Sequence, residues 1–487
     1  MKLRELLRDV EVRERRVDLD LEITSVTADS RLVVSGALFA AIPGFKTDGA
    51  KFIDAATRKG AAAIVGESNA ASIVVNDARA ALSTIAANFY GRPADKLSLA
   101  GVTGTSGKTT TTKMIESIFD AAGEPVGLIG TIEYRAGDER LMADRTTPDA
   151  VVLQQWFAKM VDAGVHHAVM EVSSHALALK RTYGIHFAAA VFTNLSQDHF
   201  DFHKDFEHYF AAKRILFDQI DRTRKTAIVN IDDEYGRRLA NELGECVVTF
   251  GRGASADVHP LDGFEISVRG LHGRVVTPAG EVGIESKLLG APNLYNWLGA
   301  IGAAQAVGID IPTIEAGIRN LATVRGRFEY VEAEGGPTVI VDYAHKPDAL
   351  EKLLQAVRDL APERRVVLIV GCGGDRDQGK RPKMGAIAAR LADYTVLTSD
   401  NPRGEKPEAI LDDIEAGMRG ATNYTRITDR RDAISRTIAE ASDNDVVVIA
   451  GKGHEPYQVI GDQVIHFDDR EEAERGLETR HENRAQN

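Results

Sequence analysis

A glycine-rich stretch that ends in a lysine and a threonine is the part of the sequence best suited to chemistry. Gly101, Gly104 and Gly107 precede Lys108 and Thr109. Glycines let the chain turn tightly, and such a turn before a helix directs several backbone N–H groups at one point. A polyphosphate fits that point, because the lysine would neutralise phosphate oxygens and the threonine hydroxyl would reach Mg²⁺. The spacing therefore predicts a phosphate-binding loop.

The residues on either side of this loop support the prediction. Leu97, Leu99 and Val102 form a short apolar run that is typical of a buried strand, and apolar residues recur at helical spacing over 114–119. The strict P-loop pattern has a glycine five positions before Gly107, where this chain has Val102. A plain flexible glycine turn is the alternative, but the strand and the helix are those that the motif requires.

The composition limits the class of protein. The 487 residues carry a net charge of −13 and are 44% hydrophobic, and the length predicts about three domains. The negative charge argues against nucleic-acid binding, and no apolar run is long enough for membrane insertion. Met1–Glu5 lacks the apolar core of a signal peptide. Two distant cysteines, Cys246 and Cys372, argue for a reducing cytoplasm.

Strands alternate with helices through the middle and last thirds, which predicts an α/β fold with mostly parallel sheets. Near the N-terminus, Asp77 is expected to cap a helix. The apolar runs Val366–Val370 and Val446–Ala450 each lead into a glycine-rich turn, as in a doubly wound sheet. The Glu- and Arg-rich tail after Arg470 is expected to form a surface helix. We expect a small α/β unit over residues 1–95, a second domain over 96–325 and a third over 326–487.

Acidic and histidine residues follow two predicted strands of the middle third. Glu171 ends one strand, and Asn194, Asp198 and His199 follow the next. Ligands of open α/β sheets gather at the carboxyl ends of strands, so Glu171 and His199, with Thr109, could bind Mg²⁺. Ordinary strand-end capping is the alternative for Glu171. A zinc site is a further alternative for the run that holds His199, although zinc usually recruits more His or Cys ligands.

The remaining candidates are basic. Lys213 lies on a predicted helix, where the residues alone favour an exposed lysine. Gly371–Arg376 matches only half of a dinucleotide fingerprint and is weak support for NAD binding. Arg376, Arg381 and Arg403 suit carboxylate or phosphate recognition. Solvated surface charge explains them equally well.

Nine motifs follow one another along the chain. They are Gly104–Thr109, Glu171–His175, Asn194–His199, Tyr209–Lys213, Asn293–Asn296, Gly326–Glu329, Asp342–His345, Asp400–Arg403 and Gly451–Glu455. Together they resemble the motifs of the Mur ligase family, and the resemblance covers essentially the whole chain. It implies the three-domain Mur ligase architecture: an N-terminal UDP-substrate domain, a central P-loop ATPase domain with a parallel sheet, and a C-terminal Rossmann-like domain that binds the incoming amino acid.

The resemblance also implies a reaction. ATP, with Mg²⁺, would phosphorylate the γ-carboxylate of UDP-N-acetylmuramoyl-L-alanyl-D-glutamate, and an amino acid would attack the acyl phosphate to become the third residue of the peptidoglycan stem. This places the chain in cell wall biogenesis, and thereby in cell shape and division. Arg403 could pair with the distal carboxylate of meso-diaminopimelate and repel the ammonium of L-lysine. We therefore predict meso-diaminopimelate, with L-lysine or L-ornithine as the alternative.

Residue roles follow from the resemblance. Lys108, Glu171, His199 and Lys213 are implied to be catalytic. Magnesium ligands would be Thr109, Glu171, His199 and Lys213, the last as a carbamate (N6-carboxylysine). Nucleotide contacts would be Gly104, Thr105, Ser106, Gly107, Lys108, Thr109, Thr110, Asn293, Asn296, Arg327 and Asp342. Contacts to the UDP substrate would be Ala28, Ser30, Thr146, Thr147, Ser173 and Arg181. The amino-acid pocket would comprise Arg376, Asn401, Arg403, Gly451 and Glu455.

Two other functions compete with this one. A folylpolyglutamate-type synthetase shares the P-loop and the carbamylated lysine, but the N-terminal UDP module and Asp400–Arg403 argue against it. A regulator that binds a nucleotide without catalysis is the other. The complete set of Lys108, Glu171, His199 and Lys213 argues against such a regulator.

Overall fold

The computed structural model describes residues 1–44, 47–200, 202–331 and 335–485. Its contacts divide the chain into two compact units. Unit 1 comprises Met1–Pro260, Val275–Val282 and Tyr295–Gly317, and unit 2 comprises Leu261–Arg274, Gly283–Leu294 and Ile318–Asn487. Within the described ranges, no helix is long and apolar enough to cross a membrane.

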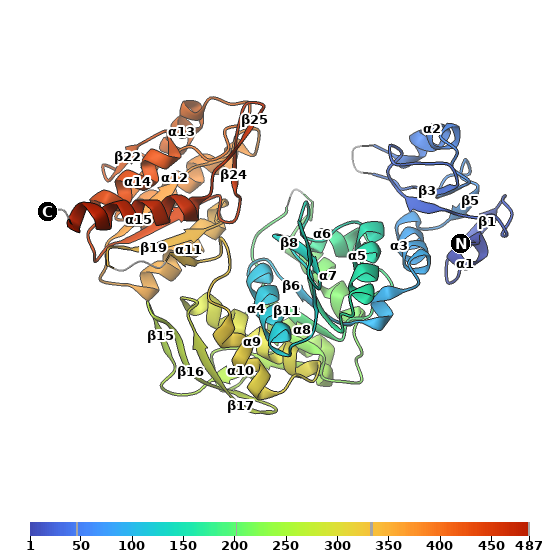
Figure 1. The fold of residues 1–487 in the computed structure, drawn as a ribbon, viewed down its shortest axis with the longest axis horizontal. Helices are drawn as coiled ribbons and strands as arrows, with labels where there is room; N and C mark the ends of the chain where they lie inside the picture. Colours follow the sequence, from blue (N-terminus) through green and yellow to red (C-terminus); the bar gives the residue numbers. More distant parts are fainter. Residues whose placement is uncertain (45–46, 201, 332–334, 486–487) are drawn as a thin grey trace. The chain divides into compact units, whose positions relative to one another are not determined.

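The N-terminal part of unit 1 is a five-stranded sheet of order β1-β5-β4-β3-β2 (Figure 1). Only the β1–β5 pair is antiparallel. Its elements are α1 (Leu3–Leu6), β1 (Val12–Arg15), β2 (Ser25–Thr27), β3 (Ala37–Ala41), α2 (Ile53–Arg58), β4 (Ala63–Gly66), β5 (Ile73–Val75) and α3 (Ala78–Phe89). Asp77 caps α3 as predicted, because its carboxylate accepts hydrogen bonds from the backbone N–H groups of Arg79 and Ala80.

The larger part of unit 1 is an eight-stranded sheet of order β13-β12-β11-β6-β10-β7-β8-β9. The six strands from β13 to β7 are parallel, as predicted, whereas β8 and β9 add an antiparallel edge. The strands are β6 (Ser98–Thr103), β7 (Val126–Ile129), β8 (Glu133–Ala136), β9 (Glu139–Met142), β10 (His167–Glu171), β11 (Ala189–Phe192), β12 (Ala227–Asn230) and β13 (Val247–Phe250). The helices are α4 (Lys108–Ala121), α5 (Ala150–Asp162), α6 (Ser174–Ala178), α7 (Phe206–Arg214) and α8 (Glu234–Leu243), together with most of α9 (Ala291–Ala306) and of α10 (Ile311–Asn320).

This strand order positions the site. The chain passes from β6 to β7 and later to β10 on one side, and then crosses to β11, β12 and β13 on the other, so the carboxyl end of β6 is a topological switch point. Gly101 does not belong to the loop there, contrary to the sequence prediction. It lies inside β6, where a Cβ atom would come within 2.8 Å of the Phe187 ring. Gly101 therefore serves close packing rather than a turn.

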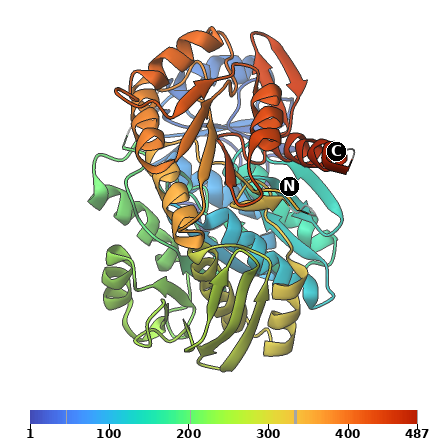
Figure 2. The same ribbon diagram turned by 90° about the vertical axis from the view of Figure 1, so that its left-hand side faces the viewer.

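A small sheet follows, with strands β14 (His259–Pro260), β15 (Glu265–Ser267), β16 (Gly270–Thr277) and β17 (Gly280–Ser286). Its order is β14-β16-β15, and β17 also pairs with β16. These strands run side by side, olive to yellow-green at the bottom of Figure 2. None of the predicted site residues lies in them.

Unit 2 contains a six-stranded sheet of order β18-β19-β23-β20-β21-β22, in which only β18 is antiparallel. The strands are β18 (Glu329–Val331), β19 (Thr338–Asp342), β20 (Val366–Val370), β21 (Tyr394–Leu397), β22 (Tyr424–Arg426) and β23 (Val446–Ala450), and a hairpin consists of β24 (Tyr457–Ile460) and β25 (Gln463–His466). The helices are α11 (Pro347–Leu360), α12 (Arg381–Leu391), α13 (Pro407–Glu415), α14 (Arg430–Glu440) and α15 (Asp469–Ala485).

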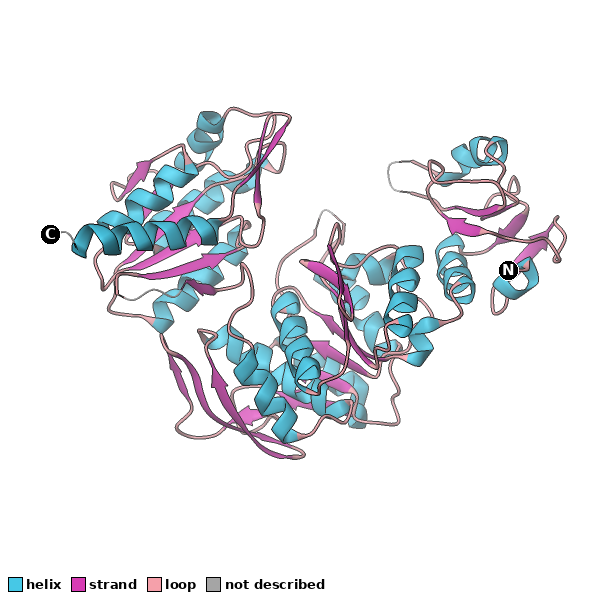
Figure 3. Ribbon diagram, viewed as in Figure 1, coloured by secondary structure: helices cyan, strands magenta, loops and turns pink. Residues whose placement is uncertain are grey.

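Helices cover both faces of this sheet, as predicted for a doubly wound fold (Figure 3). One core contains Leu350 of α11 and Met384 of α12, and the other contains Ile434 of α14 and Leu477 of α15. The tail helix α15 is therefore more than a surface helix. Its Arg480 is 7% exposed and donates to the carbonyl oxygens at the end of α14, which compensates its buried charge.

Candidate active site

The glycine loop joins β6 to α4 at the carboxyl edge of the eight-stranded sheet. Gly104 and Gly107 have φ angles of 152° and 85°, which residues with side chains rarely adopt. A Cβ atom on Gly104 would also collide with Oγ1 of Thr193. Lys108 is the first residue of α4, and Thr110 is buried in its first turn. The backbone is thus the one that a phosphate-binding loop requires.

Asn194, from the end of β11, holds this loop in place. Its carbonyl oxygen accepts a hydrogen bond from the backbone of Thr105 (2.8 Å), and its Oδ1 accepts one from the backbone of Ser106 (3.1 Å). From the sequence, Asn194 was predicted to follow a strand, but no role in the site was predicted for it. Its role in the structure is to brace the loop against the neighbouring strand.

Two lysines share one carbonyl group in the loop. Lys108 Nζ donates to the carbonyl oxygens of Gly104 (2.9 Å) and Thr105 (3.0 Å), and Lys213 Nζ donates to that of Gly104 (2.6 Å). Lys213 comes from α7, is 1% exposed, and its Nζ lies 4.4 Å from the centre of the Tyr209 ring. The residues alone predicted an exposed lysine, and that prediction is wrong.

Lys213 has an unusual charge state. Burial and the nearby Lys108 ammonium hold its pKa well below the usual value, although Asp198 acts in the opposite direction. A lowered pKa favours the neutral amine, which is the form that adds CO₂ to give a carbamate. The site is therefore suited to the modification that the resemblance implies.

Glu171 and Thr109 form a buried oxygen pair beside the loop. Thr109 Oγ1 donates to Glu171 Oε2 (3.0 Å), and the Glu171 side chain is 1% exposed. Thr131 also holds the carboxylate, because its backbone N–H donates to Oε1 (2.7 Å) and its hydroxyl donates to Oε2 (3.0 Å). Hydroxyl and carboxylate oxygens are ligands that Mg²⁺ prefers, so this pair fits the predicted metal site.

His199 lies in a separate group of rings. It adopts a positive φ of 55°, and its Nε2 lies 3.3 Å from Asp198 Oδ2. Its ring centre lies 4.8 Å from that of His175 and 6.2 Å from that of Tyr209, the ring that Lys213 also contacts. Across the described parts of the chain, no three His, Cys, Asp or Glu side chains are arranged to hold a metal. This geometry gives no support to zinc and suits a magnesium ion held by few protein ligands.

Four predicted substrate residues lie near the carboxyl end of β10 and are linked through hydrogen bonds of Thr147 and Thr131. Thr147 Oγ1 donates to the Glu171 carbonyl oxygen (2.8 Å) and accepts from the Ser173 backbone (3.1 Å). Arg181 donates to the Thr147 carbonyl oxygen (2.7 Å), and the hydroxyls of Thr146 and Thr131 are 3.0 Å apart. The structure thus brings these four together at the carboxyl edge of β10.

Ala28 and Ser30, the other two predicted substrate residues, follow β2 in the N-terminal sheet. Lys59 Nζ donates to the Ser30 carbonyl oxygen (2.9 Å) and to that of Arg31 (3.1 Å). An ammonium group therefore borders this turn, which would suit a phosphate-bearing ligand.

The predicted nucleotide contacts divide between the two units. In unit 1, Asn296 Oδ1 accepts from Thr111 Oγ1 (3.2 Å) and borders Gly107, on which a Cβ atom would lie 2.6 Å away. In unit 2, the Asp342 carboxylate accepts from two backbone N–H groups at 2.7 and 2.8 Å, and burial raises its pKa. Also in unit 2, the Arg327 guanidinium lies 5.0 Å from the Tyr343 ring centre and Asn293 is buried.

Unit 2 also gathers most of the predicted amino-acid pocket. Asn401 Nδ2 donates to Glu455 Oε2 (2.8 Å), and Gly451, with a φ of 121°, follows β23. Arg403 has a φ of 51°, and its Nη1 donates to the carbonyl oxygens of Gly374 (3.0 Å) and Asn401 (3.4 Å). Arg376 is exposed and donates to the backbone of its own turn. Asn401, Arg403 and Glu455 thus meet at the carboxyl edge of the sheet.

Three family models match the chain. The Mur ligase middle domain matches residues 102–304, the Mur ligase glutamate ligase domain 326–453, and the Mur ligase family catalytic domain 22–90. A UDP-N-acetylmuramoyl-L-alanyl-D-glutamate--2,6-diaminopimelate ligase from Gloeobacter violaceus is 46% identical over 488 residues, which span 99% of each chain. The chain belongs to the Mur ligase family.

Solved structures agree with this membership. A structure of a ligase with the same printed name is 31% identical to this Mur ligase, covers 99% of each chain and has a TM-score of 0.72. A folylpolyglutamate synthase from Mycobacterium tuberculosis shares the fold at 20% identity and a TM-score of 0.60, but the match covers only 76% of this chain. The predicted three-domain Mur ligase architecture is confirmed.

Some residues of this Mur ligase site were not predicted from the sequence. Thr131, which orients Glu171, belongs to no motif, and only its hydrogen bonds reveal it. Lys452 is 0% exposed and lies between the predicted pocket residues Gly451 and Glu455, so its position in the motif was an available signal.

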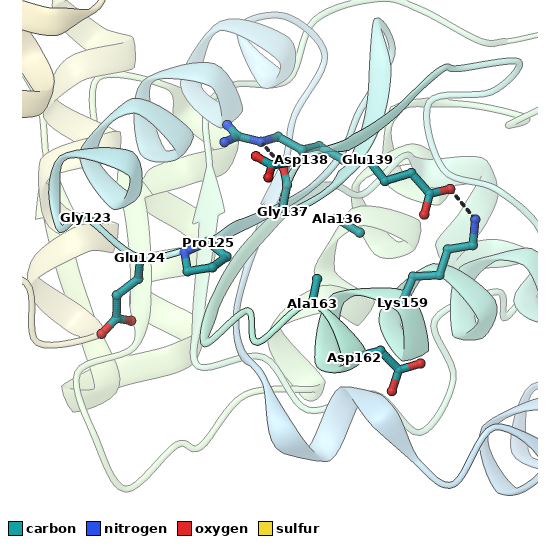
Figure 4. Close-up of a pocket in the computed structure, with 11 residues that line it drawn as sticks. Gly123, Glu124, Pro125, Ala136, Gly137, Asp138, Glu139, Lys159, Asp162 and Ala163 are labelled. Atoms are coloured by element: carbon teal, nitrogen blue, oxygen red, sulfur yellow. Dashed lines mark hydrogen bonds and ion pairs between the residues drawn. The ribbon is translucent and has the colours of Figure 1, made fainter.

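A hollow in unit 1 lies elsewhere and contains none of the predicted residues. It measures about 820 Å³ and is lined by Gly123–Pro125, Arg135–Glu139, Lys159, Asp162 and Ala163 (Figure 4). It borders the start of β7, which is the amino end of a parallel strand. Its basic groups are already engaged, since Lys159 pairs with Glu139 and Arg135 donates to Gly137. We assign no function to this hollow.

Proposed function

We propose that this Mur ligase adds meso-diaminopimelate to UDP-N-acetylmuramoyl-L-alanyl-D-glutamate at the expense of ATP, as a step of peptidoglycan synthesis. The observation that carries the proposal is the Thr109–Glu171 pair at the start of the glycine-loop helix, beside the buried Lys213. Full-length similarity to ligases that carry this reaction in their name supports it. We also propose that the enzyme works in the cytoplasm, since both of its cysteines are free and buried.

The reaction has two steps. A γ-carboxylate oxygen of the D-glutamyl residue attacks the γ-phosphorus of ATP, and the bond from that phosphorus to ADP breaks. The amine nitrogen of the incoming amino acid then attacks the carbonyl carbon of the acyl phosphate and loses a proton. The carbon–oxygen bond to phosphate breaks as the amide forms. The first step is needed because a free carboxylate is a poor electrophile.

The first step brings anions together, and unit 1 supplies the opposing charge. Lys108 would neutralise the phosphate oxygens, and Thr109 and Glu171 would hold one Mg²⁺. His199 and the carbamate of Lys213 would hold a second. Bound Mg²⁺ would screen the negative charge of the phosphates. We keep the predicted domains as part of this proposal: residues 1–95 for the UDP group, 96–325 for ATP and 326–487 for the amino acid.

The choice of meso-diaminopimelate is proposed from the arginine in unit 2. Among the described residues, the side-chain hydrogen bonds of Arg403 all start from Nη1. A guanidinium has five N–H donors, so its remaining edge can pair bidentately with a distal carboxylate. Glu455 could accept from the ammonium beside that carboxylate. L-Lysine and L-ornithine lack the distal carboxylate, and Arg403 would repel their terminal ammonium.

The test is an assay of purified protein with ATP, Mg²⁺ and UDP-N-acetylmuramoyl-L-alanyl-D-glutamate. Meso-diaminopimelate, L-lysine and L-ornithine are offered separately, and a folate with L-glutamate serves as the comparison. We expect ADP release and a tripeptide product, seen by mass spectrometry, with meso-diaminopimelate. A product only with L-lysine would refute the amino-acid assignment. A product only with folate, or ATP turnover with none of them, would refute the function.

A further inference from the structure

Lys452 is a buried ammonium group at the junction of two pocket motifs. It follows β23, lies between Gly451 and Gly453, and is 0% exposed. Its Nζ lies 3.2 Å from Asn401 Oδ1, 3.5 Å from Glu455 Oε2 and 3.7 Å from Asp400 Oδ1. A buried ammonium is costly unless it is paired, so this side chain is held by the groups that it joins.

Lys452 determines which way the Asn401 amide faces. The amide oxygen accepts from Lys452 Nζ (3.2 Å) and from the backbone N–H of Val459 (2.9 Å). Both partners can only donate, so the oxygen must face them and the amide nitrogen must face the other way. That nitrogen donates to Glu455 Oε2 at 2.8 Å. Lys452 therefore holds Glu455 twice, directly and through Asn401.

The same ammonium balances the charge of the pocket. Asp400 is 6% exposed, and its Oδ1 has no hydrogen-bond partner among the described residues, so Lys452 at 3.7 Å is its counter-charge. Arg430, another buried cation of this sheet edge, pairs with Asp469 through two hydrogen bonds of 2.7 Å. Among the described residues, Lys452 is the cation that lies within 3.7 Å of carboxylate oxygens of both Asp400 and Glu455.

Glu455 is the member of this cluster that remains partly open. Its side chain is 18% exposed, and Tyr343 donates to Oε1 only at 3.4 Å. A carboxylate that is fixed on its inner oxygen and accessible on its outer side can accept from the ammonium of a ligand. Lys452 and Asn401 both contact the inner oxygen, Oε2, and so determine where the outer oxygen, Oε1, lies.

We propose that Lys452 is a positioning residue of the amino-acid pocket, which fixes the Asn401 amide and holds the Glu455 carboxylate toward the ammonium of the incoming amino acid. This inference rests on the proposed function, because it assumes that the substrate is an amino acid. It concerns the affinity for that amino acid, whereas ATP and the UDP substrate are bound by other residues.

The test uses Lys452→Met in the full-length enzyme and the KM of each of the three substrates. We expect the KM of meso-diaminopimelate to rise ~10-fold or more, as for the loss of a charge-assisted contact. The KM values of ATP and the UDP substrate should change less than about twofold. Lys352→Met is the matched control, because this lysine of α11 is exposed and makes an i,i+4 pair with Asp348.

A second variant separates positioning from charge balance. Lys452→Met with Asp400→Asn removes one charge of each sign and should fold even if the single variant does not. We expect it to keep the raised KM for the amino acid, since Asn401 and Glu455 still lack the Lys452 donor. A wild-type KM in either folded variant, or an equal rise of all three KM values, would overturn the inference. If the wild type uses another amino acid, the proposed function is wrong. The inference about Lys452 is then tested by the KM of that amino acid in Lys452→Met.

Discussion

Lys213 and Lys452 are two buried lysines with different surroundings, one in each unit. They are 1% and 0% exposed. Lys213 Nζ donates to the Gly104 carbonyl, and no carboxylate of the described residues forms an ion pair with it. Lys452 Nζ, by contrast, lies within 3.7 Å of carboxylate oxygens of both Asp400 and Glu455. The same residue type is buried once without and once with a carboxylate at ion-pair distance among the described residues.

This difference suits the two lysines to different roles. A buried ammonium is stable when carboxylates pair with it, and Lys452 meets that condition. Without such a partner, burial favours the neutral amine, and the pKa of Lys213 is lowered accordingly. We therefore propose that Lys452, paired with two carboxylates, positions other groups. Lys213 is an amine that can become an anion by adding CO₂.

The largest expected effect comes from removing the cation of the glycine loop itself. Lys108→Ala should reduce turnover by ~10³-fold or more, because the phosphates lose the only lysine of the loop motif. Steady-state ADP release measures it, and the exposed Lys225 of the same unit provides Lys225→Ala as the control. Product formation at the wild-type rate by Lys108→Ala would contradict the proposal that this loop binds ATP.

The next prediction tests whether Lys213 acts as a carbamate. Lys213→Ala should be nearly inactive, and acetate or formate should restore part of the activity by supplying an anion where the carbamate would be. Restoration of about tenfold over the unaided variant is expected. The matched variant Lys452→Met should not respond to these acids, because its lost charge is positive. Full activity of Lys213→Ala in CO₂-free buffer would rule out the carbamate.

A smaller effect concerns the choice of amino acid in unit 2. A partly desolvated arginine–carboxylate contact is worth ~2–4 kcal/mol, or roughly 30- to 1000-fold in discrimination. Arg403→Ala should lose most of that preference for meso-diaminopimelate over L-lysine, whereas the exposed Arg419→Ala should keep it. Competition between the two amino acids at equal concentration is the measurement. If Arg403→Ala keeps the preference for meso-diaminopimelate over L-lysine, Arg403 does not determine the choice of amino acid.

A further effect is on stability and extends the comparison to a neutral, half-buried base of unit 2. Burial lowers the pKa of His345 to about 4, so this imidazole stays neutral in the folded protein. Its unfolded pKa is about 6.5, so the unfolded state binds the proton first as the pH falls. The stabilisation is fully present above about pH 6.5 and is lost toward pH 4, by up to ~3 kcal/mol.

Urea unfolding at pH 7 and pH 4.5 measures this loss. His345→Gln removes the group that must be protonated on unfolding, so it should lose less stability than the wild type between the two pH values. Equal losses in both proteins would contradict the assignment of a neutral, half-buried His345.

Local patterns in the sequence predicted much of the fold. β20 and β23 coincide with the predicted runs Val366–Val370 and Val446–Ala450, because fully buried parallel strands are continuous apolar runs. The burial of Arg480 in α15 escaped prediction. Its charge is compensated by carbonyl groups of α14 and by the Asp443 carboxylate, and such distant partners are not visible in a local pattern.

The candidate site was predictable where one short motif supplies the chemistry. The glycine loop and Glu171 fall at the carboxyl ends of strands, as expected. The burial of Lys213 was harder to predict, since it depends on packing against the carbonyl of Gly104. One signal was present, because Tyr209 lies four residues before Lys213 and so on the same face of α7.

The contrast between the two lysines can be tested in one measurement. Wild type, Lys213→Ala and Lys452→Met are each equilibrated with ¹³C-bicarbonate and observed by ¹³C NMR, which detects a labile carbamate without isolating it. We predict a carbamate signal in the wild type and in Lys452→Met, and no such signal in Lys213→Ala. A wild type without the signal, or a signal that persists in Lys213→Ala and disappears in Lys452→Met, would contradict the account.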